Sequence, residues 1–552
     1  MLLKQFPFLL ISLISAGTLF LHSPYVIGEE LLLKQYAFIG GGLLAGLVIL
    51  LRRNNYIRYD ITTIAIIGFI FLLLIGKVIS TQPEQCLPLL SFILLLIFFK
   101  ENKISEQTIS LCLISFSVLL STYGILQFFH IINSISHFTV SGTFDNPTGF
   151  AACLSSTFPL TFSIIKYNKA IAIFCIFTIA IAIILSASRT GIVSIGITTT
   201  VYLYKQIQLK SIRIKFLFLI IPLSICLFIV LILIKKESAL GRLFIWQITW
   251  NMVKDNPLGR GSGTFIAHYM QYQADFFKLH PNSDTTLLAD NIFHPFNEFL
   301  FLTVDYGIIT TFILIALIFI GLYHTKIKQF YALCLLSIGI SSLFSYPFKY
   351  PFIWFITVFC LSQCTSKNNL YIHSYFFKLI LGGIILIGSG LLEKEIKFHH
   401  NWNKAALLMS KNQTKQSLEL YKKLYTINHK NNLFLYNYGA ELNRTQSYKE
   451  SIKVLNQCTK YWNDYYIEIL LANNYINLQE WNAAENHFQK ASDMCPNRFF
   501  PLYKLHIIYQ QTNQEKLATE MAKTTINKKV KINSPLIHSI KNRMKKFLLS
   551  ND

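Results

Sequence analysis

The chain has 552 residues, of which 53% are hydrophobic, 14% aromatic and only 14% charged. Soluble domains carry roughly 25% charged residues, so this composition excludes a disordered chain, a fibrous repeat and an ordinary cytosolic enzyme. It indicates a polytopic membrane protein. The net charge of +23 suits anionic lipids or phosphate-bearing ligands. Nucleic-acid binding is not expected, because no recognition motif accompanies the charge.

The ten cysteines fall mostly inside apolar runs. They form no C-x-x-C pair and no Cys/His cluster at zinc spacing. We therefore interpret them as small buried residues and expect no metal site.

The hydropathy pattern divides the chain into two predicted domains. Residues 1–393 form a series of apolar runs, whereas residues 394–552 are polar and helical in pattern. A membrane-spanning helix needs about 20 apolar residues. We predict thirteen spans, at 7–27, 36–51, 60–79, 86–99, 107–128, 147–165, 170–187, 190–204, 214–234, 297–322, 329–346, 350–364 and 376–392.

The distribution of basic residues orients these spans with the N-terminus in the cytoplasm. In this orientation the short outer connections hold only Lys34, Lys77, Arg189 and Lys349. The long loop 235–296 then lies outside, and the odd number of spans also places the C-terminal domain outside. A difference of one span after the ninth would move that domain to the cytoplasm.

The C-terminal domain repeats with a period of 33 or 34 residues. Three columns share it: Ser417, Ser451, Ala484 and Ala518; Tyr421, Leu455, Phe488 and Ala522; Leu408, Leu442, Tyr475 and Tyr509. The pattern resembles a tetratricopeptide array of three to four repeats over residues 400–530. Such an array is an α-solenoid of stacked helix pairs with a concave surface for a peptide or protein partner.

Four polar clusters lie on the predicted outer side, where charge beside a membrane indicates function. The first is Gly142–Phe150, in which Asp145 and Asn146 precede a proline. These two residues either cap the next span or form a polar wall of a substrate site.

The second cluster is Ser186–Gly191, whose short connection holds Arg189 at or near membrane depth. Its guanidinium suits a lipid head group or a diphosphate, because its planar donors match phosphate oxygens.

The third cluster is Gly241–Phe265, in the long outer loop. Arg242, Trp246 and Trp250 recur at a spacing of four residues, which places them on one face of a helix. Tryptophan favours the membrane interface, so we expect an amphipathic helix along that interface.

The fourth cluster is His294–Thr310, at the start of the tenth span. His294 precedes Pro295, which suits a first helical position, so we expect His294 at the mouth of the helix. A neutral imidazole there can accept a proton from a sugar hydroxyl. A structural role for this histidine is the alternative, and Asp290 and Glu298 are the next candidates for the base.

The order of these motifs resembles the membrane family of O-antigen ligases, O-antigen polymerases and bacterial protein O-oligosaccharyltransferases. The resemblance covers residues 60–365 and rests on GTFxNP, SxSRxG, an Arg-to-Trp helix leading into NPLGxGxGTF, and an Asn ten residues before a glycine. It implies an all-α fold, a GT-C-like helical bundle followed here by the solenoid. It also implies a glycosyltransferase of the bacterial inner membrane that uses no metal or other cofactor. The donor would be a glycan on undecaprenyl diphosphate, transferred on the periplasmic side.

Matched to the family, Arg189 and Arg242 would bind the donor diphosphate and His294 would be the general base. The supporting candidates are Asp145, Asn146, Asn297, Asp290 and Glu298. The family's transfer motif is His-Asn, nine residues, then Gly-x-x-Gly. Here Phe296 stands in the His slot before Asn297, and His294 lies two residues upstream.

Ligases, polymerases and protein glycosyltransferases share these motifs. We place transfer to a lipid A-core or protein acceptor ahead of polymerisation. A transporter and an inactive scaffold that presents the repeats are alternatives from another class. The absence of an internal repeat in 1–393 argues against a transporter. The expected partners are the lipid-linked glycan, its acceptor, membrane lipid and a protein on the repeat surface.

Overall fold

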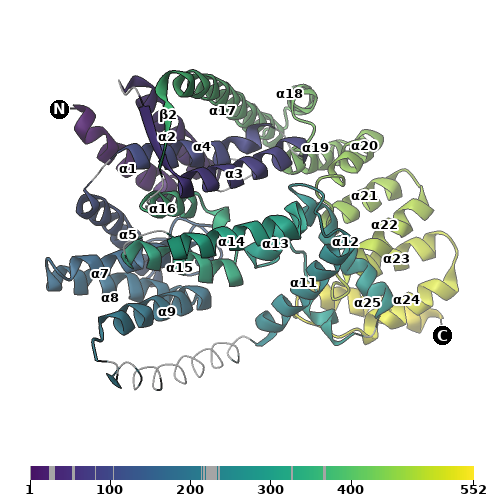
Figure 1. The fold of residues 1–552 in the computed structure, drawn as a ribbon. Helices are drawn as coiled ribbons and strands as arrows, with labels where there is room; N and C mark the ends of the chain where they lie inside the picture. Colours follow the sequence, from purple (N-terminus) through teal and green to yellow (C-terminus); the bar gives the residue numbers. More distant parts are fainter. Residues whose placement is uncertain are drawn as a thin grey trace. The chain divides into compact units, whose positions relative to one another are not determined.

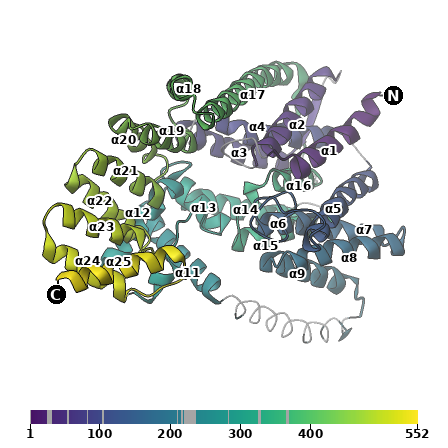
Figure 2. The same ribbon diagram turned by 180° about the vertical axis from the view of Figure 1, so that it is seen from behind.

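The computed structural model divides into two compact units. Unit 1 contains residues 1–234, 296–302 and 309–403, and unit 2 contains residues 235–295, 303–308 and 404–552. The structure describes residues 2–23, 31–52, 56–80, 83–102, 105–209, 236–281, 283–324, 329–364 and 369–551, and single positions at 211, 212, 214, 218, 233 and 327. Figures 1 and 2 show the helices from two opposite sides.

Unit 1 is built mainly from apolar helices, as expected for a membrane protein. Among the described residues, five helical segments are long and apolar enough to cross a membrane: α2 (Leu32–Leu51), α3 (Ile61–Ser80), the 3-10 turn η1 (Pro83–Cys86) together with α4 (Leu87–Glu101), α5 (Glu106–Phe128) and α17 (Ser374–Ser410). The shorter apolar helices are α1 (Leu2–Phe20), α8 (Lys169–Leu185), α14 (Ile308–His324), α15 (Gln329–Phe344) and α16 (Pro351–Ser362). The predicted span 214–234 lies almost entirely outside the described residues.

The predicted span 147–165 is interrupted in the structure. It consists of α6 (Pro147–Thr157), the 3-10 turn η2 (Phe158–Leu160) and α7 (Thr161–Ile164). Pro159 lies in η2 and has no backbone N–H to donate, which explains the break in the α-helical hydrogen bonds.

Small residues allow the helices of unit 1 to pack closely. A Cβ atom on Gly42 of α2 would lie only 2.4 Å from the Cβ atom of Ser91 in α4. The Ser91 hydroxyl donates to the carbonyl oxygen of Ile39 at 3.3 Å. Close helix contacts through Gly and Ser are typical of membrane proteins, where apolar area alone gives little preference for one neighbour.

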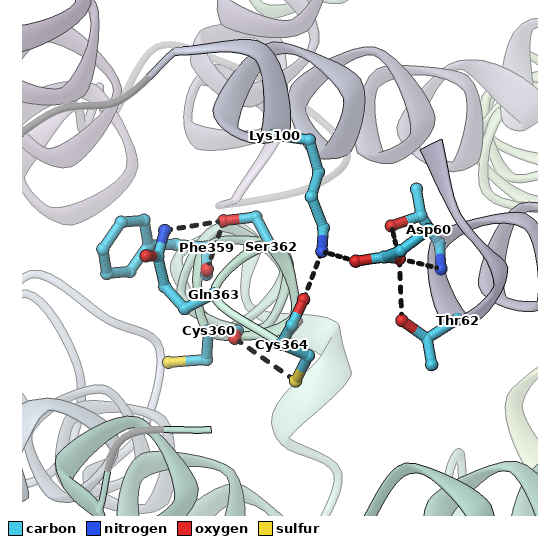
Figure 3. A network of polar contacts seen from close by, with 9 residues as sticks. Asp60, Thr62, Lys100, Phe359, Cys360, Ser362, Gln363 and Cys364 are labelled. Atoms are coloured by element: carbon cyan, nitrogen blue, oxygen red, sulfur yellow. Dashed lines mark hydrogen bonds and ion pairs between the residues drawn. The ribbon is translucent and has the colours of Figure 1, made fainter. Parts of the chain in front are cut away.

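A short antiparallel sheet joins two distant parts of unit 1. Its strands are β1 (Tyr56–Asp60) and β2 (Asn369–His373). Figure 3 shows the polar network at the end of β1. Lys100 Nζ lies 2.8 Å from Asp60 Oδ2 and also donates to the carbonyl oxygen of Cys364, just after α16. One cation therefore links β1, α4 and α16, at the end of the helices predicted to face the cytoplasm.

The last apolar span and the first helix of the repeats are one continuous helix, α17. Within it, Lys394 Nζ lies 2.5 Å from a carboxylate oxygen of the buried Glu84 in unit 1. The division between the two units falls later, between Asn403 and Lys404. The expected boundary after residue 393 therefore marks a change of hydropathy inside a helix.

The C-terminal helices of unit 2 form the expected tetratricopeptide solenoid, in which successive helices pack on one another. They are α18 (Thr414–Ile427), α19 (Asn432–Arg444), α20 (Tyr448–Cys458), α21 (Tyr465–Asn477), α22 (Trp481–Met494), α23 (Phe500–Gln511), α24 (Glu515–Asn527) and α25 (Pro535–Asn551). The small residues of the first column, Ser417, Ser451, Ala484 and Ala518, are all fully buried. A Cβ atom on Gly439 would lie 2.6 Å from Leu455 Cδ2, so the two helices of that repeat touch where the period predicted.

The long loop 235–295 also belongs to unit 2 and is largely helical. It contains α11 (Lys236–Asp255), α12 (Thr264–Leu279) and the 3-10 turn η3 (Asp284–Leu288). The buried carboxylate of Asp305 accepts hydrogen bonds from the N–H groups of Gly263 at 2.9 Å and Phe265 at 3.2 Å. These N–H groups lie at the N-terminus of α12, where helix geometry leaves them unpaired and a negative charge is favourable.

Two glycines allow the backbone of the loop near Leu258 to pack closely against the backbone of residues 305–307. Gly259 has a φ of 74° and Gly307 a φ of 89°, which favour glycine. A Cβ atom on Gly307 would lie 2.4 Å from the carbonyl oxygen of Leu258. A Cβ atom on Gly259 would lie 2.6 Å from the carbonyl oxygen of Asp305. The predicted span 297–322 is consequently divided at Gly307 into α13 (Glu298–Tyr306) and α14.

Ala484 tests the helix contacts of the solenoid. We expect Ala484→Leu to lower the free energy of unfolding by ~1–3 kcal/mol, because the larger side chain overpacks a fully buried site. The measurement is chemical denaturation of the segment 404–552, followed by circular dichroism. Asn482→Leu, at an exposed position of α22, is the matched control. Equal stability of the two variants, or a disordered segment, would contradict the repeat packing.

Asp305 tests the attachment of the long loop. Asp305→Ala leaves two N–H groups of α12 without their acceptor, at about 1–3 kcal/mol for each buried donor. We expect faster hydrogen exchange at residues 263–266 of the full-length protein. Asp275→Ala removes an exposed carboxylate of α12 that bonds Gln271, and it should leave that exchange unchanged. Unchanged exchange in Asp305→Ala would show that the cap does not hold the loop.

Candidate active site

The first predicted cluster begins α6 as the sequence indicated. Asn146 Oδ1 accepts a hydrogen bond from the N–H of Gly149 at 3.0 Å, and a proline occupies the first helical position. The preceding turn is anchored by Lys34, which is fully buried. Its Nζ donates to Thr143 Oγ1 at 2.9 Å and lies 4.2 Å from the centroid of the Phe144 ring. These contacts fix the chain immediately before the cap.

The second cluster begins α9 (Arg189–Gln206), so Arg189 is the first residue of this helix. Ser188 caps the helix by accepting a hydrogen bond from the N–H of Gly191 at 3.4 Å. A Cβ atom on Gly191 would lie 2.8 Å from the Cβ atom of Ala151 in α6. The glycine of the SxSRxG motif therefore brings the first turn of α9 against α6.

Serines further along the same helices show their direction. Ser337 of α15 donates to the carbonyl oxygen of Ser155 in α6 at 2.7 Å. Its hydroxyl also lies 2.7 Å from the hydroxyl of Ser194 in α9. Ser155 lies about one turn after Ala151 in α6, and Ser194 lies about one turn after Gly191 in α9. Because the two helices approach each other at both levels in the same chain direction, α6 and α9 run parallel and their N-termini are adjacent. Helix N-termini carry partial positive charge, so this end of unit 1 favours anions.

The segment 346–350, between α15 and α16, gathers the polar side chains of the first cluster. Lys349 Nζ lies 2.6 Å from Asp145 Oδ2, and the Tyr350 hydroxyl donates to Asp145 Oδ1 at 3.0 Å. Asn146 Nδ2 donates to the Tyr346 hydroxyl at 3.1 Å and to the Tyr350 hydroxyl at 2.8 Å. The Lys349 side chain is 37% exposed.

The fourth cluster starts its helix later than expected. The helix α13 begins at Glu298, and Asn297 caps it by accepting hydrogen bonds from the N–H groups of Phe299 and Leu300, both at 3.0 Å. Phe296 has a φ of 54°, a left-handed conformation that interrupts any helix beginning at the preceding proline. The prediction that His294 lies at the start of this helix was therefore wrong, because the helix begins only at Glu298. His294 lies in a non-helical segment before the cap.

Asn297 and Glu298 also contact the end of α15 and the segment that follows it. Asn297 Nδ2 donates to the carbonyl oxygen of Leu343 at 3.2 Å. Glu298 Oε1 accepts a hydrogen bond from the backbone N–H of Phe348 at 3.0 Å. Unit 1 thus brings four of the supporting candidates, Asp145, Asn146, Asn297 and Glu298, to one end of α15.

The third cluster meets the His294 segment within unit 2. Trp246 Nε1 on α11 donates to the carbonyl oxygen of Pro295 at 2.8 Å, next to His294. Arg242 lies one turn before Trp246 on the same helix. Trp250 is 45% exposed. The buried face of α11 consists of Phe244, Ile245, Ile248, Thr249, Met252 and Val253.

The remaining candidate of the loop, Asp290, is held by a cation. Its Oδ1 lies 3.1 Å from a guanidinium nitrogen of Arg498, in the turn between α22 and α23. A second imidazole of the loop lies on α12. Burial, and then the charge of Arg260, lower the pKa of His268 below its usual range and favour its neutral form. Within the described ranges, no group of three His, Cys, Asp or Glu side chains is arranged to hold a metal ion.

The predicted site residues are therefore distributed over both units. Arg189, Asp145, Asn146, Asn297 and Glu298 belong to unit 1, whereas Arg242, Asp290 and His294 belong to unit 2. The sequence analysis missed Tyr346, Lys349 and Tyr350 as contributors to the site. Their signal was the sequence YPFKYP, which places a cation and two phenols beside two prolines at the predicted outer end of two spans.

Comparison with solved structures gives only distant likenesses. MamA from residue 41 onward, from Desulfovibrio magneticus RS-1, is 17% identical, covers 25% of this chain and 81% of its own, and has a TM-score of 0.23. The Cut9–Hcn1 hetero-tetramer of APC/C is 9% identical, covers 93% of this chain and 86% of its own, and has a TM-score of 0.22. Scores this low carry no argument about fold or function. No curated protein matches the chain.

A protein-family model gives the informative match. The model described as O-antigen ligase matches residues 174–315. This segment includes Arg189, Arg242 and His294, and the match supports ligase-like glycan transfer in general. Residues 174–315 of the chain are therefore similar to the O-antigen ligase family.

Proposed function

We propose that the protein transfers a glycan from undecaprenyl diphosphate to the hydroxyl of a lipid A-core or protein acceptor. The observation that carries this proposal is the pair of parallel helices α6 and α9 with adjacent, capped N-termini, one of which begins with Arg189. Two helix dipoles and a guanidinium favour a multiply charged anion such as a diphosphate. The O-antigen ligase match, which includes α9 and Arg189, supports the choice of a lipid-linked glycan.

The proposed roles follow from the chemistry of each side chain. Arg189 and Arg242 bind the diphosphate through their planar donors and stabilise the charge that develops as it leaves. The neutral imidazole of His294 takes the proton of the acceptor hydroxyl. The acceptor oxygen bonds to the anomeric carbon while the bond from that carbon to the phosphate oxygen breaks. A single displacement of this kind inverts the anomeric carbon.

The proposed location is the inner membrane of a bacterium, with the loop, the site and the repeats facing the periplasm. The orientation rests on the positions of the lysines and arginines in the sequence. The polymerisation of a surface polysaccharide is the second candidate, because it uses the same donor and differs only in the acceptor. In that case the growing glycan itself would supply the acceptor hydroxyl.

Lysine substitution tests the binding of the diphosphate. Arg189→Lys and Arg242→Lys keep the positive charge but lose the paired donors of the guanidinium. We expect each to lower kcat/KM for glycan transfer by about 100- to 1000-fold, the range for losing a donor to developing negative charge. The measurement is transfer from a purified lipid-linked glycan to an acceptor in vesicles. Arg260→Lys, in the same loop, is the control and should keep its activity. Full activity in both test variants would remove the proposed diphosphate site.

Alanine substitution tests the base. We expect His294→Ala to lower transfer by about 10²–10⁴-fold, the usual contribution of a general base. Binding of the donor should change little, since the imidazole acts on the acceptor. His268→Ala removes another imidazole of the loop and should transfer normally. Full transfer by His294→Ala would assign the base elsewhere, and Asp290→Asn and Glu298→Gln would then be compared in the same assay.

A further inference from the structure

The segment that leads to His294 lies along the turns of the tetratricopeptide repeats. Asn497 Nδ2, in the turn between α22 and α23, donates to the carbonyl oxygen of Ala289 at 2.6 Å. Gln273 of α12 is fully buried, and its Nε2 donates both to the carbonyl oxygen of Asp290 at 3.0 Å and to that of Met494 at 2.6 Å. One amide therefore connects the loop helix, the segment and the end of α22.

The side chain of Asp290 is anchored by the same turn. Its Oδ1 lies 3.1 Å from a nitrogen of Arg498. Arg498 is itself fixed by the repeat that precedes it. Its guanidinium donates to the Tyr466 hydroxyl at 3.0 Å and lies 4.4 Å from the centroid of the Tyr465 ring. The cation therefore contacts α21 and holds the segment at the same time.

A second turn of the solenoid binds the next residues. Asn291 Nδ2 donates to Asp464 Oδ2 at 2.8 Å, and the other oxygen of Asp464 caps α21 through the N–H of Ile467 at 2.9 Å. The ring of Phe293 lies 5.9 Å from the ring of Trp462, centroid to centroid. Contacts with two successive repeat turns thus continue to the residue before His294.

The segment 289–297 has no regular secondary structure to fix its course. Fixing a residue in one backbone conformation costs about 1–2 kcal/mol of entropy, so the geometry of such a segment must come from its partners. A general base also has to stay within hydrogen-bond reach of the hydroxyl that it deprotonates. In unit 2, the contacts of residues 289–291 and 293 are made largely by the repeats.

We infer that Asn497, Arg498 and Asp464 are positioning residues, through which the tetratricopeptide repeats hold His294 in its reactive place. The inference rests on the proposed function of His294. It gives the solenoid a direct part in the transfer step, in addition to any partner that it binds. It also assigns Asp290 as an anchor of the segment, instead of as a base.

The ion pair between Asp290 and Arg498 allows a test by exchange of charges. The variants Asp290→Lys and Arg498→Glu each place two like charges together, and the double variant restores an opposite pair in reverse order. We expect each single variant to lower kcat by about 10- to 100-fold, the loss that a displacement of about 1 Å can cause. The KM for the lipid-linked glycan should stay within about twofold, because the anchors act on the base. The double variant should recover most of the lost kcat.

Neutral variants and a control separate positioning from folding. Asn497→Ala removes a hydrogen bond to the segment without adding a charge, and it should lower kcat in the same direction. Lys504→Ala removes another cation of the solenoid, one that lies 5.6 Å from the centroid of the Phe500 ring on its own helix α23, and it should transfer normally. The full-length proteins are compared in vesicles, and their melting temperatures are measured in detergent.

Each result has a distinct meaning. Reduced kcat at an unchanged melting temperature, with recovery in the double variant, supports the inference. An unchanged kcat in the single variants overturns it and leaves the proposed function intact, provided that His294→Ala is inactive in the same assay. Parallel loss of activity and melting temperature without recovery also overturns it, since the turns would then serve stability alone. If His294→Ala is fully active, the proposed function of His294 fails first and the positioning role fails with it.

Discussion

The long loop depends on one buried carboxylate. Asp305 satisfies the N-terminus of α12, and this fixes the helix whose buried Gln273 bonds both the loop segment and the end of α22. An uncapped, buried helix terminus would leave N–H donors without partners at a considerable free-energy cost. The cap by Asp305, the contacts of Gly259 and Gly307 and the hydrogen bonds of the Gln273 amide all hold the same loop. Loss of the cap would therefore loosen the glycine contacts and the amide hydrogen bonds. The position of the residues proposed to react in this loop therefore depends on the hydrogen bonds of Asp305.

In unit 1, two helix N-termini provide partial positive charge. Its two parallel helices begin side by side, and each is capped by a side chain that leaves the helix dipole directed outward. Asp145 is the only acidic group that the first cluster contributes, and Lys349 neutralises it. The partial positive charge of the two helix N-termini consequently favours an anionic ligand here.

The tetratricopeptide solenoid is usually regarded as a surface that binds a separate partner. In this protein its turns contact the chain's own loop, through the backbone carbonyl of Ala289, the side-chain amide of Asn291 and the ion pair between Asp290 and Arg498. These contacts use the turns between repeats, whereas the period of the repeats is set by buried residues such as Ala484 and Gly439 inside the helix pairs. The same solenoid can therefore keep its fold and support a neighbouring segment, since different residues perform the two tasks.

The sequence by itself determined the features that depend on local pattern. Hydropathy gave the apolar helices, the period of the small residues gave the solenoid, and Asn146 before a proline gave the cap of α6. The motif order also led to the O-antigen ligase family. Only the tertiary structure decided the left-handed Phe296, the cap by Asp305 and the pairing of Asp145 with Lys349. Each of these depends on contacts or backbone geometry set by residues far apart in the chain, and no periodicity or spacing in the sequence encodes which distant partner a polar group will meet.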